Sequence, residues 1–426
     1  MAVALSNSQL PYAAPIAAPQ AQPRVWAAGD TALGKLAFAT LWIFVFVMPW
    51  EESVPLWGGF VISRWVALVA VSLLVLAVLA TRRLRRPCAL HMLMLAFVAW
   101  SAVTLFWTID SLSTQTRVGT YSQLLLAVWM MWELATTEDR VRSLLQAYVM
   151  GATVLCVSTI INYSLGIQAS DLAAEQGIVK SQDFRYTMYG INANDLALMV
   201  AISLPLTAYL LLHARSRLLK LYCWLYLGIA LTTLFLVGSR GGLIAATAGL
   251  MLFPLLMSRM GRLPTIGFVL VCAIGIGCGV YFVPNDVWKR LLATGTEITQ
   301  GTMTHRTSLW DAGFEAFRDH VWSGVGSGAY ATAIYKAAGI ALVAHNTFIS
   351  VLVEMGIPGF LLFAALLAAI FYTAWSFRGA DRRFWIVTLL TWSIGVAALT
   401  WEYRKPTWFL FGLLVAHAYA RRDARS

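Results

Sequence analysis

Two arginines in this chain are candidates for binding a phosphate group. Arg240 lies in the turn Gly-Ser-Arg-Gly-Gly at 238–242, between two apolar runs, and Arg306 opens an amphipathic segment with apolar residues at helical spacing. A planar guanidinium forms paired hydrogen bonds with phosphate oxygens, which suits arginine to this task better than lysine. The ordinary alternatives are that Arg240 reaches lipid headgroups and that Arg306 belongs to a solvated helix face. We favour anion binding at Arg240 and treat Arg306 as a second candidate for a lipid phosphate.

A lone histidine, His345, stands beside Asn346 at the start of a later apolar run. Imidazole accepts a proton near neutral pH, which makes His345 a candidate base or orienting group for a sugar hydroxyl. Histidines at a membrane boundary are commonly structural, but this run is interrupted at 356–359 by Gly-Ile-Pro-Gly, and a broken helix can face a water-filled cavity. Glu354 lies about 180° from His345 on an ideal helix, so we expect it to hold a structural hydrogen bond near the break.

Further polar residues lie on the same predicted side of the membrane. Asn192, Asn194 and Asp195 cluster at the start of an apolar run, where helix capping explains them and substrate contact is the sharper hypothesis. Arg185 and Arg404 are candidates for the lining of a cavity that accepts an anionic glycolipid. Anchoring at the membrane interface explains these two arginines equally well.

The glycines of the segment 323–328 form a Gly-x-Gly-x-Gly run after the amphipathic segment. No strand is expected before it, which excludes a dinucleotide-binding fold. A turn is the default interpretation, and a backbone anion nest is the weaker one. The outer loops contain no Asp-x-Asp or His-x-x-x-His pattern, so we predict neither a metal nor a cofactor, and expect arginines to neutralise a pyrophosphate.

Composition places these residues in a polytopic membrane protein. Hydrophobic residues make up 59% of the chain and charged residues 12%, and the mean hydropathy is +0.71. The five cysteines lie in apolar runs without metal-ligand spacing. Much of the net charge of +11 falls in short loops between these runs, where it indicates topology and not a nucleic-acid partner.

The apolar runs predict an all-α bundle of about twelve transmembrane helices, because a span needs roughly 17–25 apolar residues. The runs lie at 35–50, 60–80, 89–107, 118–135, 141–165, 190–212, 218–237, 241–257, 265–283, 344–375, 384–401 and 408–420. Lys and Arg collect in cytoplasmic loops, which places both termini in the cytoplasm. We therefore expect a disordered cytoplasmic tail at 1–34, nine spans in 35–284, a large outer loop with amphipathic helices and the catalytic segment at 285–343, three spans in 344–420 and a cytoplasmic tail at 421–426.

These motifs together resemble the O-antigen ligase family and its relatives, the O-antigen polymerases and the bacterial O-linked oligosaccharyltransferases. The residues that carry the resemblance are the turn 238–242, the segment 306–310, the glycine run 323–328, and His345-Asn346 followed by the break at 354–359. Their order and their predicted location on the outer side make the set specific. The resemblance covers roughly 190–375, and the first five runs match only in hydropathy.

The resemblance implies a metal-independent, inverting glycosyltransferase of the bacterial inner membrane, with the fold of the lipid-linked-sugar glycosyltransferase (GT-C) class and a periplasmic active site. The implied donor is an undecaprenyl-pyrophosphate-linked glycan, and the implied acceptor is a sugar hydroxyl of lipid A-core in lipopolysaccharide biosynthesis. By motif, Arg240 and Arg306 would hold the pyrophosphate and His345 would assist the acceptor hydroxyl. Asn346, Arg185, Asn194 and Arg404 are the further substrate-binding candidates, and membrane lipids are the remaining partners.

Ligases and polymerases use the same donor, so these motifs leave both open. We favour the ligase because the resemblance is closest there and no additional soluble region follows the twelfth run. A secondary transporter or flippase is the alternative from another class, since many spans and a broken helix would suit it. Against it, the hydropathy shows no two-half repeat, and the largest segment outside the membrane is a single outer loop.

Overall fold

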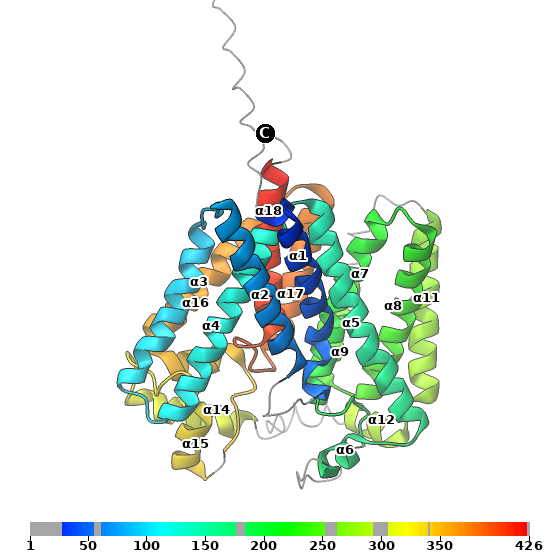
Figure 1. Ribbon diagram of the computed structural model, residues 1–426. Coiled ribbons are helices and arrows are strands. Elements are labelled where there is room, and N and C mark those ends of the chain that lie inside the picture. The colour runs from blue at the N-terminus through cyan, green and yellow to red at the C-terminus, as the bar shows by residue number, and fades with distance from the viewer. Residues whose placement is uncertain are drawn as a thin grey trace, which may run out of the picture.

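Long apolar helices make up most of the chain, as the hydropathy predicts (Figure 1). The computed structural model describes residues 28–54, 61–175, 184–251, 262–292, 306–339 and 341–423. Most of the tail predicted at 1–34 and part of the predicted outer loop, at 293–305, therefore lie outside the described residues. Side-chain caps start several of the helices; for example, Asp110 accepts a hydrogen bond from the Ser113 N–H at 3.0 Å.

Each of the twelve predicted runs overlaps a helix among the described residues; the part of the run 241–257 after residue 251 lies outside them. The long helices are α1 (Ala32–Val47), α2 (Ile62–Thr81), α3 (Ala89–Val103), α4 (Ser111–Leu134), α5 (Glu138–Ser164), α7 (Ala193–His213), α8 (Arg217–Val237), α9 (Arg240–Met251), α11 (Arg262–Phe282), α16 (Thr347–Ser376), α17 (Gly379–Val396) and α18 (Lys405–Asp423). Among the described residues, 7 helical segments are long and apolar enough to cross a membrane; they contain α1, α2, α3, α5, α7, α8 and α16. The protein is thus an all-α, multi-pass membrane protein, and the total of twelve spans remains a prediction.

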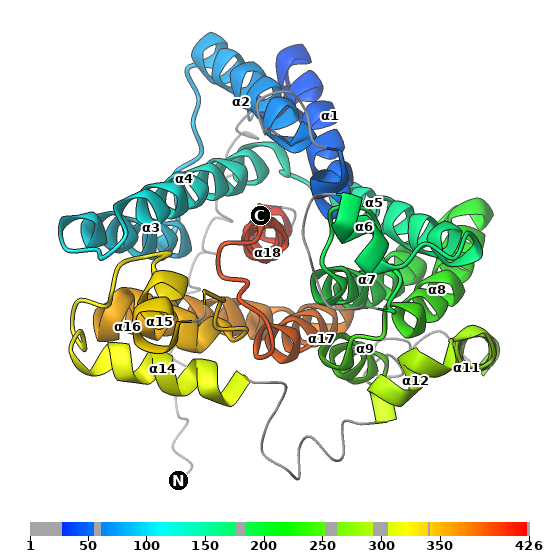
Figure 2. The same cartoon turned by 90° about the horizontal axis from the view of Figure 1, so that it is seen from below.

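The last helix, α18, runs through the centre of the bundle (Figure 2). Every residue from 406 to 417 is buried. A helix that is apolar on all sides can be covered by lipid or by protein, and α18 packs mainly against α4, with further contacts to α16 and α5. The other helices therefore surround α18, which is the last helix in the sequence.

Short helices gather at one end of the bundle, the lower end in Figure 1, opposite the C-terminus. We call this the outer end; its short helices are α6 (Ala169–Glu175), α12 (Asn285–Leu292), α14 (Arg306–Arg318) and α15 (Tyr330–Ala338). The predicted amphipathic helix is confirmed as α14. Its Leu309 shares a small apolar core with Tyr330 of α15 and Val353 of α16. This core fixes α14 and α15 to the start of α16.

The glycine run lies against a break in α16. Gly356 has φ 68° and ψ −175°, which interrupts the helix as the sequence predicted. The Val325 N–H donates to the Val353 carbonyl at 3.0 Å, and the Gly326 N–H donates to the Glu354 carbonyl at 2.9 Å. The loop thus satisfies carbonyls that the break leaves without helical partners. Because its N–H groups are used in this way, the loop is a turn, as the default interpretation held, and not an anion nest.

Close packing between α7 and α9 generates a stability prediction. A Cβ atom added to Gly242 of α9 would lie 2.3 Å from the Cβ of Ala197 in α7, so the two helices would have to separate. We expect Gly242→Ala to lower the free energy of unfolding by about 1–3 kcal/mol, measured by thermal unfolding in detergent. The control is Gly119→Ala in α4, where no atom lies within 4 Å of the added Cβ. Alanine at 119 should be neutral or slightly stabilising because of its higher helix propensity. Equal losses in both variants would contradict this account.

Candidate functional site

Arg240, Arg306 and His345 come from three separate parts of the chain and meet at the outer end. Arg240 is the first residue of α9, Arg306 is the first residue of α14, and His345 lies two residues before α16. Arg306 is partly buried, and its pKa is lowered first by burial and then by the positive charge of Arg240. The pKa of His345 is lowered by burial and then by the charge of Arg306. The three side chains predicted to do chemistry therefore lie within electrostatic range of one another.

The turn that carries Arg240 is held by Asn194 at the start of α7. Gly238 ends α8 in the left-handed conformation, with φ 57°, and α9 begins two residues later. The Asn194 Oδ1 atom accepts hydrogen bonds from the Ser239 hydroxyl at 2.9 Å and from Arg185 Nη1 at 3.3 Å. Two further candidates, Asn194 and Arg185, are thus brought to the same turn. Gly242 serves close packing against α7, so its lack of a side chain has a structural reason besides ligand approach.

Arg306 is positioned by the attachment of α14 to its neighbours. The indole N–H of Trp310, one turn further along, donates to the Ala344 carbonyl at 2.9 Å. The Tyr330 hydroxyl donates to the Leu309 carbonyl at 2.8 Å. These contacts fix the start of α14, and Arg306 lines a small cavity together with Asn194 of α7 and Ser239.

His345 occupies a strained turn. Its φ of 48° lies in the left-handed region, where a residue with a side chain is uncommon. The next residue, Asn346, caps α16 by accepting from the N–H groups of Phe348 at 2.9 Å and Ile349 at 3.1 Å, and its amide donates to the Ala397 carbonyl at 3.0 Å. Asn346, a predicted substrate contact, is thus used to hold the turn. Strain of this kind persists only where the surroundings impose it, and it concentrates at functional sites.

The charges around His345 favour a neutral imidazole. Burial lowers its pKa, the charge of Arg306 lowers it further, and the carboxylate of Asp195 acts in the opposite direction. A histidine whose pKa lies below its usual range is unprotonated at neutral pH, and only that form accepts a proton. The lowered pKa of His345 therefore suits a base or a hydrogen-bond acceptor better than an acid.

Arg404, the last predicted substrate contact, is ion-paired. Its Nη2 lies 3.1 Å from Asp195 Oδ2, and its Nη1 pairs with Glu52. The indole N–H of Trp401 donates to the other oxygen of Asp195 at 2.7 Å. Asp195 therefore connects Arg404 to the electrostatic surroundings of His345. Arg404 also lines a second small cavity with Trp401 and Glu52, and substrate contact there remains a prediction.

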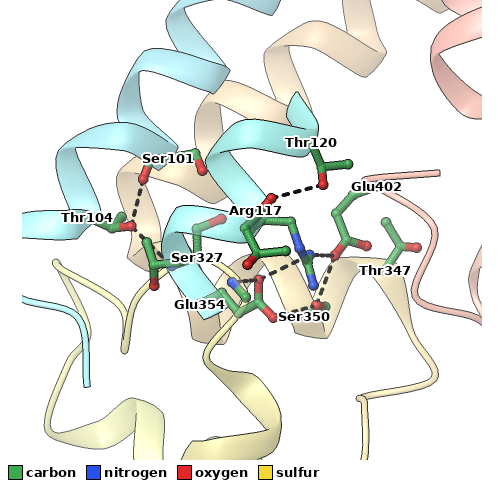
Figure 3. A network of polar contacts seen from close by, with 12 residues as sticks. Ser101, Thr104, Arg117, Thr120, Ser327, Thr347, Ser350, Glu354 and Glu402 are labelled. Carbon is green, nitrogen blue, oxygen red and sulfur yellow. Dashed lines mark hydrogen bonds and ion pairs between the residues drawn. The ribbon is translucent and has the colours of Figure 1, made fainter. Parts of the chain in front are cut away.

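The protein also contains a buried charge cluster that was not predicted from the sequence (Figure 3). Arg117 of α4 pairs with Glu402, in the loop between α17 and α18, at 2.9 Å and lies 3.5 Å from Glu354 of α16. Glu354 also accepts the Gly328 N–H at 2.7 Å, which confirms its expected structural hydrogen bond near the break. The available signal was that Arg117 and Glu402 are charged residues bordering apolar runs, where charges are commonly paired.

The comparisons with known proteins add one finding. Residues 225–364 match the family model described as O-antigen ligase. This segment contains Arg240, Arg306 and His345 as well as the glycine run. The matched domain is shared by O-antigen ligases, O-antigen polymerases and O-oligosaccharyltransferases, and indicates a glycosyltransferase-type enzyme that uses lipid-linked glycans. No curated protein and no solved structure matches the chain.

The electrostatics of the site predict opposite changes in the pKa of His345. Arg306→Gln removes a positive charge that opposes protonation, so the pKa should rise. Asp195→Asn removes a negative charge that favours protonation, so the pKa should fall. We would follow the pH dependence of His345 modification by diethyl pyrocarbonate, using mass spectrometry of the purified protein. Arg318→Gln, at the exposed far end of α14, is the control and should leave the profile unchanged. Profiles for Arg306→Gln and Asp195→Asn that both match the wild type would exclude this arrangement of charges.

Proposed function

We propose, starting from the O-antigen ligase domain formed by residues 225–364, that this protein transfers a glycan from undecaprenyl pyrophosphate to a sugar hydroxyl of lipid A-core. The observation that carries the proposal is the convergence of two arginines and a histidine, whose pKa is lowered by burial and by Arg306, at one end of a membrane bundle. In this proposal the outer end faces the periplasm, both termini are cytoplasmic, and the protein lies in the bacterial inner membrane. The fold belongs to the GT-C class with about twelve spans.

Arg240 and Arg306 have the chemistry to hold the donor's pyrophosphate. Two guanidinium groups at close range repel each other, and a bound dianion would relieve that repulsion. When the bond between the anomeric carbon and the pyrophosphate oxygen breaks, negative charge grows on that oxygen. Fixed cationic donors stabilise the transition state, in which this charge has grown, more strongly than the ground state. Each such contact typically raises the rate by about 10²–10³. The arginines therefore act as electrostatic catalysts as well as donor ligands.

His345 acts on the acceptor. The neutral imidazole accepts a hydrogen bond, and then the proton, from the acceptor hydroxyl, while that oxygen attacks the anomeric carbon on the face opposite the leaving group. The new glycosidic bond forms as the old carbon–oxygen bond breaks, the configuration inverts, and the bond's electron pair leaves with undecaprenyl pyrophosphate. Asn346 keeps the histidine's turn in place, and Asn194 with Arg185 keeps the Arg240 turn in place. No step in this scheme calls for a metal or a cofactor.

The proposal predicts different defects for the arginine and histidine variants. Purified protein is supplied with undecaprenyl-pyrophosphate-linked glycan and rough lipopolysaccharide in EDTA, and product is followed by gel mobility and mass spectrometry. Arg240→Ala and Arg306→Ala should weaken donor binding and reduce transfer by at least about 10²-fold. His345→Ala should abolish measurable transfer while donor binding stays at the wild-type level. Arg318→Ala is the control for loss of an arginine from α14.

Other outcomes of this assay point to other functions. If the donor is consumed only into longer lipid-linked chains, the protein is a polymerase that uses the same donor site. If glycan appears on protein, it is an O-linked oligosaccharyltransferase. Movement of a solute across proteoliposomes without any glycosidic bond would identify a transporter or flippase and would refute the enzyme.

A further inference from the structure

The cluster of Arg117, Glu354 and Glu402 joins three elements that are distant in the sequence. Arg117 Nη1 lies 2.9 Å from Glu402 Oε1 and 3.5 Å from Glu354 Oε2, and its guanidinium stacks on the ring of Tyr403 at 3.7 Å (Figure 3). The Ser350 hydroxyl is 3.1 Å from Glu402 Oε1 and 3.4 Å from Glu354 Oε1. Glu354 and Glu402 are almost completely buried, with exposed fractions of 2% and 1%. The cluster thus connects α4, α16 and the loop between α17 and α18 inside the protein.

The cluster holds one cation and two carboxyl groups. In the part of the chain that the structure describes, no group hydrogen-bonds the buried Oε2 atom of Glu402. Burial raises the pKa of Glu402 to about 7; Arg117 opposes this rise and Glu354 adds to it. The other titratable groups that interact with Glu402 are Tyr121 of α4 and its own neighbour Tyr403. The raised pKa therefore favours the protonated form of Glu402, and Oε2 is its oxygen without a hydrogen-bond partner among the described residues.

Glu354 connects the cluster to the glycine run. Glu354 Oε2 accepts the Gly328 N–H at 2.7 Å, and the neighbouring Ser327 N–H donates to the Thr104 hydroxyl at 3.1 Å. The loop that carries these groups leads from α14, which carries Arg306, to α15. Glu354, which lies beside Arg117, therefore holds the loop that follows the helix with the second arginine.

The segment that carries Glu402 connects the cluster to the turn of His345. Glu402 follows Trp401 in the chain. The backbone N–H of Trp401 donates to the Thr347 hydroxyl at 2.8 Å, and that hydroxyl donates to the Leu399 carbonyl at 2.8 Å. Thr347 is the first residue of α16, two positions after His345. Displacement of Glu402 would consequently move the strained turn of His345.

We propose that Arg117 is a positioning residue of the glycan-transfer site, and that its contacts with Glu354 and Glu402 fix the glycine run and the His345 turn relative to each other. This inference rests on the proposed function, because it assigns Arg117 a role in that reaction. Arg117 does not contact substrate in this proposal. It sets the separation between the group that assists the acceptor and the helix that binds the donor.

The test compares Arg117→Ala and Arg117→Lys with the wild type in full-length protein. Kinetics give kcat and the donor KM, and hydrogen exchange gives local mobility. A misplacement near 1 Å can lower rates about 10²-fold, so Arg117→Ala should lower kcat by about that factor with the donor KM unchanged. Hydrogen exchange should increase in the glycine run and at 345–350 and stay unchanged elsewhere. Lysine keeps the charge without the fork and should restore part of kcat.

The matched control is Arg142→Ala, which removes an arginine paired with Glu138 and Asp139 near the C-terminal end of α18. It should leave kcat and exchange at the outer end unchanged. Wild-type kcat and exchange in either Arg117 variant would overturn the proposal. Exchange that rises equally over the whole protein in Arg117→Lys would also overturn it, because the role would then be general stability.

A third variant, Glu402→Gln, tests the proton on Glu402. A carboxyl group whose pKa is raised on folding stabilises the fold fully below its unfolded pKa, and this stabilisation is lost as pH rises through the folded pKa of about 7. The wild-type Tm should therefore fall between about pH 4.5 and pH 7 and level off above that range, whereas the Tm of Glu402→Gln should change less. The variant should keep wild-type kcat at pH 6. A Tm below that of the wild type at pH 8.5 would mean that ionised Glu402 is required, which would overturn this part.

Failure of the proposed function is distinguishable from failure of this inference. If wild-type protein transfers no glycan, the proposed reaction is wrong whatever Arg117 does. Hydrogen exchange at the glycine run and at 345–350 still reports in that case whether Arg117 couples the two segments. If the wild type transfers glycan and Arg117→Ala behaves as the wild type, only the positioning role is refuted.

Discussion

The break in α16 at Gly356 is the constraint on which the outer end depends. A helix that stops inside a protein leaves backbone carbonyls without partners, and each buried, unsatisfied group costs about 1–3 kcal/mol. The N–H groups of Val325 and Gly326 satisfy two of these carbonyls. These hydrogen bonds hold the loop against α16. The loop follows α14, so they also help to place α14, which begins with Arg306. A local requirement for hydrogen bonds thus decides where a distant arginine lies.

The second feature that follows from this arrangement is an imbalance of charge. The charge of Arg240 helps to lower the pKa of Arg306, after burial, and elsewhere one guanidinium, that of Arg117, is shared by Glu354 and Glu402. Neither arrangement is what stability alone would select, since replacing buried ion pairs by apolar groups is often neutral or favourable. The fold tolerates both because α18 and its neighbours supply a large apolar core.

The sequence predicts local features of this protein well. Apolar runs predicted the helices, the amphipathic pattern predicted α14, and the Gly-Ile-Pro-Gly motif predicted the break in α16. These predictions hold because each depends on residues a few positions apart. The pairing of Arg117 with Glu402 joins residues 285 positions apart, and nothing in either local sequence specifies the partner. The central position of α18 escaped prediction for the same reason, because hydropathy distinguishes apolar from polar surroundings but not lipid from protein.

The candidate site illustrates the same division. Residue type made Arg240, Arg306 and His345 candidates, since few side chains suit phosphate binding or proton transfer. Residue type could not separate groups that face a substrate from groups that hold the protein together, because the same atoms do both. Asn346 uses its oxygen to cap α16 and its amide to hold Ala397, and Arg404 pairs with two carboxylates. The contacts of Asn346 hold the turn of His345, whereas those of Arg404 hold Asp195, whose charge acts on the pKa of His345. Substrate contact by either residue remains a prediction.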